Sequence, residues 1–199
     1  SDANSAFFVF AFIVGIFLMS ILLMIQLNSF YQVFIIVSAV ILSTNGVFLG
    51  LLVTQQISSA LFTSLGIIAL AGIVVNNNIV LVDTYNVITK ENPELSREEI
   101  VVRTAAQRLR PIILTTATTV IGLLPLASGI GVDFYQRNIE IGGRVSEWWQ
   151  PMSFAVVSGL TFASAITLFL TPCWLMLPVA IKNTFSNLRN TFTKTASER

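Results

Sequence analysis

The chain has 199 residues, of which 54% are hydrophobic and 11% are charged, and its mean hydropathy is +0.80. A typical soluble domain is about 25% charged, so this composition indicates an integral membrane protein. The net charge of +1 does not favour a nucleic-acid partner, and the lack of His excludes histidine-ligated metals and histidine acid–base catalysis. The sequence contains no catalytic motif, metal-ligand spacing or phosphate-binding loop, so we predict neither an enzyme nor a cofactor.

Charged residues are missing from three long stretches. None occurs between Ala3 and Val82, within 111–132 or within 148–181. The first stretch is much longer than the ~20 residues of one spanning helix, and polar breaks at 26–29 and 54–59 divide it. We therefore predict an all-α membrane protein with five transmembrane helices in a domain covering residues 1–181. The predicted spans are residues 6–27, 31–53, 60–88, 111–129 and 151–179.

The distribution of Lys and Arg predicts the orientation of these helices. Nine of the 11 Lys and Arg residues lie between the third and fourth spans or in the tail 182–199, while Arg137 and Arg144 lie in the predicted loop 130–150. Positive charge concentrates on the cytoplasmic side of membrane proteins. The tail is therefore expected to be cytoplasmic, and the loop and the N-terminus periplasmic.

The segment 96–110 between the third and fourth spans is predicted to be a short helix. Ser96 and Glu99 have the spacing of an N-terminal capping box, and Pro111 is expected to open the following span. This charged composition favours a solvated connector over a catalytic element.

The third span contains three consecutive Asn residues. Asn76 and Asp83 are seven residues apart, so they share one helix face with Gly72. That face must look into the protein or a water-filled path, and Asn77 and Asn78 need partners on neighbouring helices. Two interpretations stay open: the Asn residues join helices while Asp83 marks the end of the span, or the face belongs to a proton or ion path.

The fourth span carries a stripe of hydroxyl groups. Thr115, Thr118, Thr119 and Gly122 fall on one face at helical spacing. Each Thr can bond a carbonyl of its own helix without any further function. A hydroxyl stripe beside an Asn/Asp stripe nevertheless suggests a shared polar environment. Positions expected to serve helix packing are Gly46, Gly50, Ser164, Thr167 and Thr171.

Four segments resemble a known family. They are GIVVNNNIVLVDTYN, RTAAQRLRPIILTTATTVIGLLPLA, LNSFYQVFIIVSAVILSTNGVFLG and QPMSFAVVSGLTFASAITLFLTPCWLML. Across essentially the whole chain they resemble the second half of resistance–nodulation–division (RND) efflux pumps. The resemblance implies that the five helices are the last five of a twelve-helix transporter. Since the chain starts at Ser1 without Met, we expect an N-terminal part of that transporter as a partner.

The resemblance also implies roles for single residues. Asn76 occupies the position of a relay Lys in many multidrug members, Thr115 that of a relay Thr, and Arg108 that of an Arg near the same helix's cytoplasmic end. The proton-relay candidates are Asn76, Thr115, Asp83 and Asn77, with Arg108 and Gly72 in support. Because Asn carries no charge, a Lys–Asp charge switch is excluded, and an acid outside this chain is expected to pair with Asn76.

RND pumps are drug/proton antiporters of the inner membrane of Gram-negative bacteria. They are typically homotrimers that work with a periplasmic adaptor and an outer-membrane channel. The resemblance implies this function, this multi-pass location in the lipid bilayer and these partners. Two alternatives stay open: a truncated product that inserts without transporting, and the membrane part of another RND-superfamily protein such as a protein-export accessory.

Overall fold

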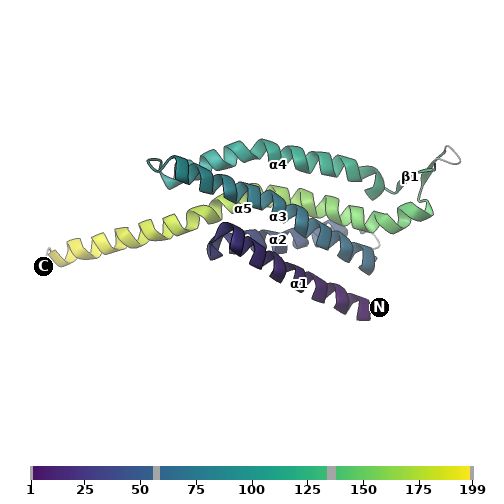
Figure 1. Cartoon of the computed structure of the whole chain (residues 1–199), viewed down its shortest axis with the longest axis horizontal. Helices are drawn as coiled ribbons and strands as arrows, with labels where there is room; N and C mark the ends of the chain where they lie inside the picture. Colours follow the sequence, from purple (N-terminus) through teal and green to yellow (C-terminus); the bar gives the residue numbers. More distant parts are fainter. Residues whose placement is uncertain (1, 56–58, 134–137, 198–199) are drawn as a thin grey trace.

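The computed structural model describes residues 2–55, 59–133 and 138–197 (Figure 1). Its elements are α1 (Asp2–Leu27), α2 (Phe30–Thr54), α3 (Ala60–Glu91), α4 (Arg97–Ala127), β1 (Ile130–Asp133), β2 (Asn138–Ile141) and α5 (Arg144–Ser197). Within these residues, five helices each contain a stretch long and apolar enough to cross a membrane, which confirms the predicted fold class. Helices satisfy their own backbone hydrogen bonds, and lipid cannot do so.

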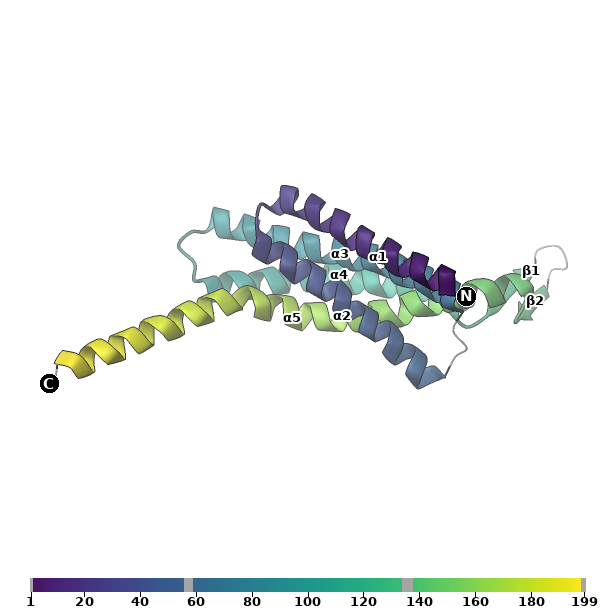
Figure 2. The ribbon, with the colours of Figure 1, turned by 90° about the horizontal axis from the view of Figure 1, so that it is seen from below.

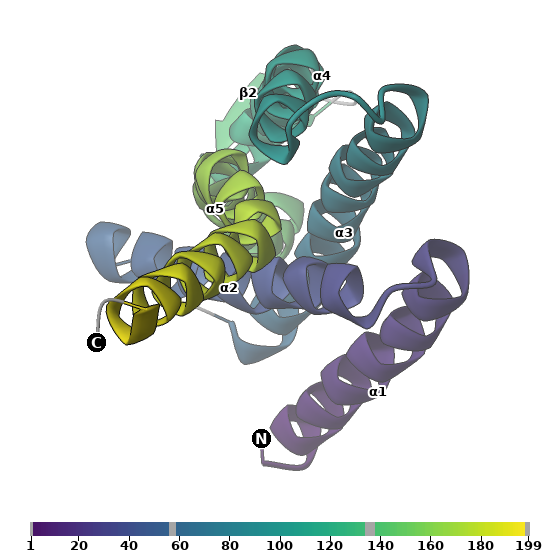
Figure 3. The ribbon, with the colours of Figure 1, turned by 90° about the vertical axis from the view of Figure 1, so that its left-hand side faces the viewer.

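Helices α2, α3 and α5 form the buried centre of the bundle. Viewed along the bundle, α5 lies among α2, α3 and α4, while α1 stands apart (Figure 3). About 39–44% of the membrane window of each inner helix is buried, against 6% for α1 and for α4. The core contains the fully buried side chains Ile36, Val47, Leu70, Val82 and Leu160.

Small residues let α2 and α5 approach closely. A Cβ on Gly46 would lie 2.5 Å from the Phe162 Cβ, and one on Gly50 would overlap Ser158. The packing role predicted for these two glycines is therefore confirmed. Gly159 of α5 in turn lies directly against side chains of α2 and α3. Such contacts are common between membrane helices, where close van der Waals packing drives association.

Two helices are longer than the sequence analysis predicted. The connector 96–110 and the span 111–129 form one helix, α4, that passes through Pro111. Pro removes a single N–H, whereas ending the helix there would expose several backbone groups beside the bilayer. Helix α5 begins inside the expected loop 130–150 and runs through the tail to Ser197, since neither Gly nor Pro follows Pro178 to end it.

The start of α4 has the predicted N-terminal cap. The Ser96 Oγ accepts a hydrogen bond from the Glu99 backbone N–H at 3.2 Å. The Glu99 carboxylate accepts a hydrogen bond from Arg103 Nη2 at 3.0 Å, and both side chains are about half exposed. Glu98 and Glu99 also lie in the first turn, where negative charge complements the helix dipole.

A short antiparallel hairpin of β1 and β2 lies within the expected loop 130–150. Ile130 pairs with Ile141 at its base. Gly129 and Gly142 flank the strands with φ of +76° and +82°, and the Gly142 N–H donates to the Gly129 carbonyl at 2.9 Å. Glycine suits both positions because side chains disfavour the left-handed region.

The bundle has two distinct ends. The N-terminus lies towards the end with the hairpin, here called the hairpin end (Figures 1 and 2). The turn between α3 and α4 and the extension of α5 lie towards the opposite end, here called the turn end. Lys90 and Arg97 flank that turn. The assignment of the turn end to the cytoplasm stays a prediction.

Candidate functional site

The three Asn residues of α3 have three different environments. Asn76 is exposed, Asn77 is half-buried, and Asn78 is fully buried at 0% exposure. Successive residues of an α-helix are rotated by about 100°, so Asn76 and Asn78 lie on nearly opposite sides of α3. One run of identical residues therefore serves two faces of the helix.

Asn78 is hydrogen-bonded within α3 and to α5. Its Nδ2 donates to the Val74 carbonyl at 2.9 Å, and its Oδ1 accepts from the Thr171 hydroxyl at 3.0 Å. Thr171 is itself buried, so the pair is shielded from lipid and water. The predicted interhelical partner of Asn78 is thus confirmed. Buried amides need such partners because an unpaired polar group in a dry interior is costly.

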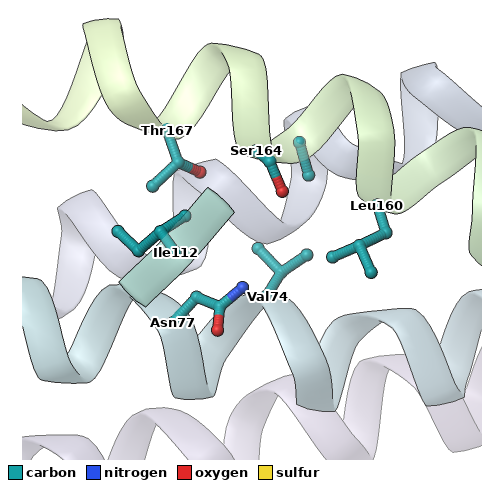
Figure 4. Close-up of a pocket in the computed structure, with 7 residues that line it drawn as sticks. Val74, Asn77, Ile112, Leu160, Ser164 and Thr167 are labelled. Atoms are coloured by element: carbon teal, nitrogen blue, oxygen red, sulfur yellow. The ribbon is translucent and has the colours of Figure 1, made fainter. Parts of the chain in front are cut away.

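Asn77 lines a narrow pocket among α3, α4 and α5. Figure 4 shows the Asn77 amide on one side of this pocket and the hydroxyls of Ser164 and Thr167 on the other. Its apolar walls are Val74, Ile112, Leu160 and Ala163. The gap between these side chains is too narrow for a water molecule. Polar groups of α3 and α5 therefore face each other across it without room for water between them.

One threonine of α4 joins the same region. The Thr116 and Ser164 hydroxyls share a hydrogen bond of 2.7 Å between α4 and α5. The hydroxyl stripe predicted from the sequence did not include Thr116. It lies one turn after the buried Ile112, which could have marked the α5 side, but apolar residues surround α4 too evenly for that signal to stand out. We call the polar positions that α3, α4 and α5 present to one another the inner seam: Asn77, Asn78, Thr116, Ser164, Thr167 and Thr171.

The other side of α3 is an open face formed by Gly72, Asn76 and Asp83. All three are exposed, and a Cβ on Gly72 would meet no heavy atom within 4 Å. The open face turns away from α5, because the buried residues of α3 already fill that contact. At Asp83 this face borders side chains of α4, whereas Asn76 is exposed and the space around Gly72 is open in the described residues. Any protein partner for Asn76 must therefore come from outside the described part of the chain.

Thr115 lies on an open face of α4. It is exposed, and its hydroxyl donates to the carbonyls of Pro111 at 3.1 Å and Ile112 at 3.0 Å. Thr118 and Thr119 also bond carbonyls of their own helix, at 2.9 and 2.8 Å. Bonding within the helix, the simpler of the two interpretations, therefore accounts for these three hydroxyls in the structure. Their rotatable O–H groups can still turn to an outside partner.

A contact between α3 and α4 places Asn76 and Thr115 at the same depth. Arg108 Nε donates a hydrogen bond to the Thr84 hydroxyl, which donates to the Val80 carbonyl at 2.8 Å. The two helices run antiparallel from this contact, and each rises about 10 Å over the next two turns. Two turns before Thr84, α3 carries its Asn residues. Two turns after Arg108, α4 carries Thr115.

Arg108 also lines a polar cavity of about 270 Å³ at the turn end. Asp83 and Glu91 line it from α3, and Arg103 and Gln107 line it from α4. A water molecule occupies about 30 Å³ in the liquid, so the cavity has room for several. Of the relay candidates, Asp83 can therefore exchange a proton with water, whereas the amides and hydroxyls can only hydrogen-bond.

The structure thus brings the relay candidates together in part. Asn76 and Thr115 share a depth, Asp83 lies on the same stripe of α3 as Asn76, and Arg108 lines the cavity with Asp83. Asn77 departs from this group, because it turns towards α5. The residues that the sequence did not single out for the site are Thr84 and Thr116, whose partners are 24 and 48 residues away in the sequence.

Known proteins resemble this chain closely enough to assign its family. The model of the AcrB/AcrD/AcrF family matches residues 2–178. The multidrug resistance protein MdtC of Klebsiella pneumoniae is 33% identical over 126 residues, which cover 62% of this chain and 11% of MdtC. MdtC of Yersinia pestis is 32% identical over 135 residues, covering 68% of this chain and 11% of that protein.

Solved structures agree with the sequence comparison. A crystal structure of a heavy metal efflux pump matches with a TM-score of 0.65 and 30% identity, over 81% of this chain and 15% of the pump. A second crystal form gives a TM-score of 0.61 over 79% of this chain. The chain therefore spans 11–15% of the length of these relatives. With five membrane helices and a match over nearly its whole length, the chain belongs to the AcrB/AcrD/AcrF family and is a membrane segment of an RND efflux pump.

Proposed function

We propose that these helices form part of the proton pathway of a proton-driven drug efflux transporter. One observation carries the proposal: Asn76 and Thr115 both lie exposed within their spans, on the neighbouring helices α3 and α4. An amide left without partners in lipid costs about 1–3 kcal/mol. Such a residue is therefore expected to face a polar partner or a water path, and polar groups inside membranes commonly mark ion routes.

Asn76 acts in this proposal as the hydrogen-bond partner of an acid from another part of the transporter. An ionised carboxylate only accepts hydrogen bonds, so it takes them from the Asn76 amide nitrogen and the Thr115 hydroxyl. Once protonated, the acid can donate to the Asn76 amide oxygen instead. Protonation thereby exchanges one hydrogen-bond pattern for another without any charge on Asn76.

Asp83 and Arg108 serve the turn end of this pathway. Asp83 follows Asn76 by two turns on the open face, and both Asp83 and Arg108 line the cavity that has room for water. A proton released by the acid would reach Asp83 after about 10 Å along α3. Arg108 is hydrogen-bonded to Thr84, which keeps its positive charge in the cavity that Asp83 also lines.

Substituting Asn76 tests the proposal. In a complete transporter containing these helices, Asn76→Leu should abolish drug resistance and proton-coupled transport while the protein is still made. Leu keeps a similar shape but leaves the partner acid without its donor. The matched control is Asn45→Leu, which changes an exposed Asn of α2 that lies away from the open face. Full resistance with Asn76→Leu, or equal loss with both variants, contradicts the relay role.

We further propose that the turn end is cytoplasmic, in the bacterial inner membrane, and that the transporter is a homotrimer working with a periplasmic adaptor and an outer-membrane channel. Glu147→Cys at the hairpin end and Glu94→Cys at the turn end report the orientation, since both positions are exposed. A membrane-impermeant maleimide applied outside the inner membrane should label position 147 and spare position 94. The reverse pattern would overturn the orientation.

Expression of the 199 residues alone separates a transporter part from an inserted product without activity. We expect no drug protection from this chain in a pump-deficient strain, because Asn76 and Thr115 lack their partner acid. Co-expression with the remaining part of a transporter as a separate chain should restore protection. Failure to restore it, with both chains present in the membrane, favours the alternative of a product that does not transport.

A further inference from the structure

One row of buried residues on α3 faces α5. Gly66, Leu70, Val74 and Asn78 follow one another at intervals of four residues, and all four are buried. Towards the hairpin end the contact is very close: a Cβ on Gly66 would lie 2.8 Å from the Ala155 Cβ. Helices pack along such rows because residues four apart form a ridge on the helix surface.

Asn78 is the only polar side chain of this row, and it is the one that bonds across to α5. Leu70 and Val74 make apolar contacts with their neighbours. The energy of such contacts changes little when one helix shifts slightly past the other. A hydrogen bond has a preferred distance and angle, so it specifies one arrangement. A single buried Asn can set the register of packed helices for the same reason.

We propose that the hydrogen bond between Asn78 and Thr171 fixes the rotation and the axial register of α3 against α5, and that it thereby orients Asn76. The fixed register rests on the contacts alone, whereas the role of the oriented Asn76 rests on the proposed function. Asn76 and Asn78 belong to the same turn of α3, so any rotation of that turn carries both side chains. Asn78 therefore acts as a positioning residue, because it influences Asn76 through the helix turn that carries both.

The inner seam has a second part that does not replace this bond. Asn77 lies among Ser164 and Thr167 in a pocket too narrow for water. If α3 rotated, the Asn77 amide would move within this narrow gap towards apolar walls of the neighbouring helices, such as Ile112 and Leu160. Resistance to rotation therefore comes from the whole seam, but its only side-chain hydrogen bond between α3 and α5 in the described residues is that of Asn78.

The test uses a complete transporter that contains these helices, in membranes, with Cys173→Ser to remove the exposed native thiol. Asn76→Cys then serves as a reporter, and the rate of its modification by N-ethylmaleimide measures how accessible that position is. Thr171→Val breaks the bond to Asn78 with little change of shape. An interhelical hydrogen bond in a bilayer changes the equilibrium between the bonded and the unbonded helix arrangement by about threefold on average. The rate of maleimide modification at position 76 should therefore rise by about threefold.

A matched control has the same chemistry at an exposed site. Thr161→Val also lies on α5, but the Thr161 hydroxyl bonds only the Val157 carbonyl of its own helix at 2.7 Å. This variant should leave the rate unchanged. No rise with Thr171→Val, or an equal rise with Thr161→Val, overturns the proposal.

The double variant Asn78→Leu with Thr171→Val separates positioning from simple stabilisation. Removing both partners leaves no buried polar group unpaired, so the amount of folded protein should recover relative to Thr171→Val alone. The rate at position 76 should stay raised, because the directional bond is still absent. A rate that returns to the reference value would mean that the bond only stabilises the bundle. Since Asn76 is replaced in every arm, these results do not depend on its relay role.

Discussion

The two outer helices, α1 and α4, are equally little buried but differ in what can cover them. In each, 6% of the membrane window is buried. Helix α1 presents large apolar side chains, among them Phe10, Phe17 and Leu22, which lipid can surround without loss. Helix α4 also exposes large apolar side chains, such as Leu114 and Ile121, but it presents the hydroxyl groups of Thr115 and Thr118 beside them.

Equal exposure of α1 and α4 in the isolated chain therefore reflects two different surroundings, lipid in one case and a polar partner in the other. The surface of α1 matches lipid, whereas the open surface of α4 lies beside the open face of α3 with Asn76. These two surfaces belong to adjacent antiparallel helices, so one further helix can cover both. Under the proposed function, the uncovered polar groups mark the side on which the rest of the transporter would dock, and lipid can surround α1.

The largest expected loss of folded protein distinguishes a substitution in the inner helices from one in the outer helices. Gly159→Leu forces a side chain into the space filled by Leu70 and Val47, an overpacking that costs at least about 1–3 kcal/mol. Gly15→Leu on α1 meets no heavy atom within 4 Å of its Cβ and should be tolerated. Folded protein measured by size-exclusion chromatography in detergent should fall sharply for the first variant alone. Similar yields would contradict the tight contact at Gly159.

A second prediction tests the contrast between α1 and α4 directly. In a complete transporter, nitroxide labels introduced through Phe17→Cys and Thr118→Cys should differ several-fold in collision rate with oxygen, which concentrates in the bilayer interior. The label on α1 should be the more accessible, because lipid surrounds it. In the 199-residue chain alone the two rates should approach one another. Equal rates in the complete transporter would mean that α4 also faces lipid.

The sequence predicted the helices well because lipid imposes a strong rule on composition. Stretches without charge marked five spans, and polar residues inside them correctly required a partner for Asn78. The continuity of α4 through Pro111 was missed, since a local breaker signal was outweighed by the cost of exposing backbone at the bilayer surface. Which threonine of α4 bonds to Ser164 of α5 depends on the rotation of α4 about its own axis. Only packing between residues far apart in the sequence sets that rotation.

A third prediction concerns the attachment of α4 to α3. Arg108→Ala leaves the Thr84 hydroxyl without its charged donor, and hydrogen bonds to charged groups contribute about 1.5–3 kcal/mol. Arg103→Ala removes only a surface ion pair with Glu99, worth about 0.3–0.5 kcal/mol within a helix. Thermal denaturation of the purified protein should therefore show a clear loss for Arg108→Ala and almost none for Arg103→Ala. The reverse order would show that the contact with Thr84 does not hold α4.

The smallest expected loss of stability lies at a hydrogen bond between two hydroxyl groups of α4 and α5. Thr116→Val and Ser164→Ala each remove one side of a single hydrogen bond, which contributes about 0.6 kcal/mol on average between membrane helices. A double-mutant cycle should give a coupling energy of about that size. Thr118→Val, whose hydroxyl bonds only its own helix, should show no coupling to Ser164→Ala. Coupling at Thr118 would mean that α4 is rotated relative to this arrangement, and the hydroxyls of Thr115 and Thr118 would then turn towards α5 instead of an outside partner.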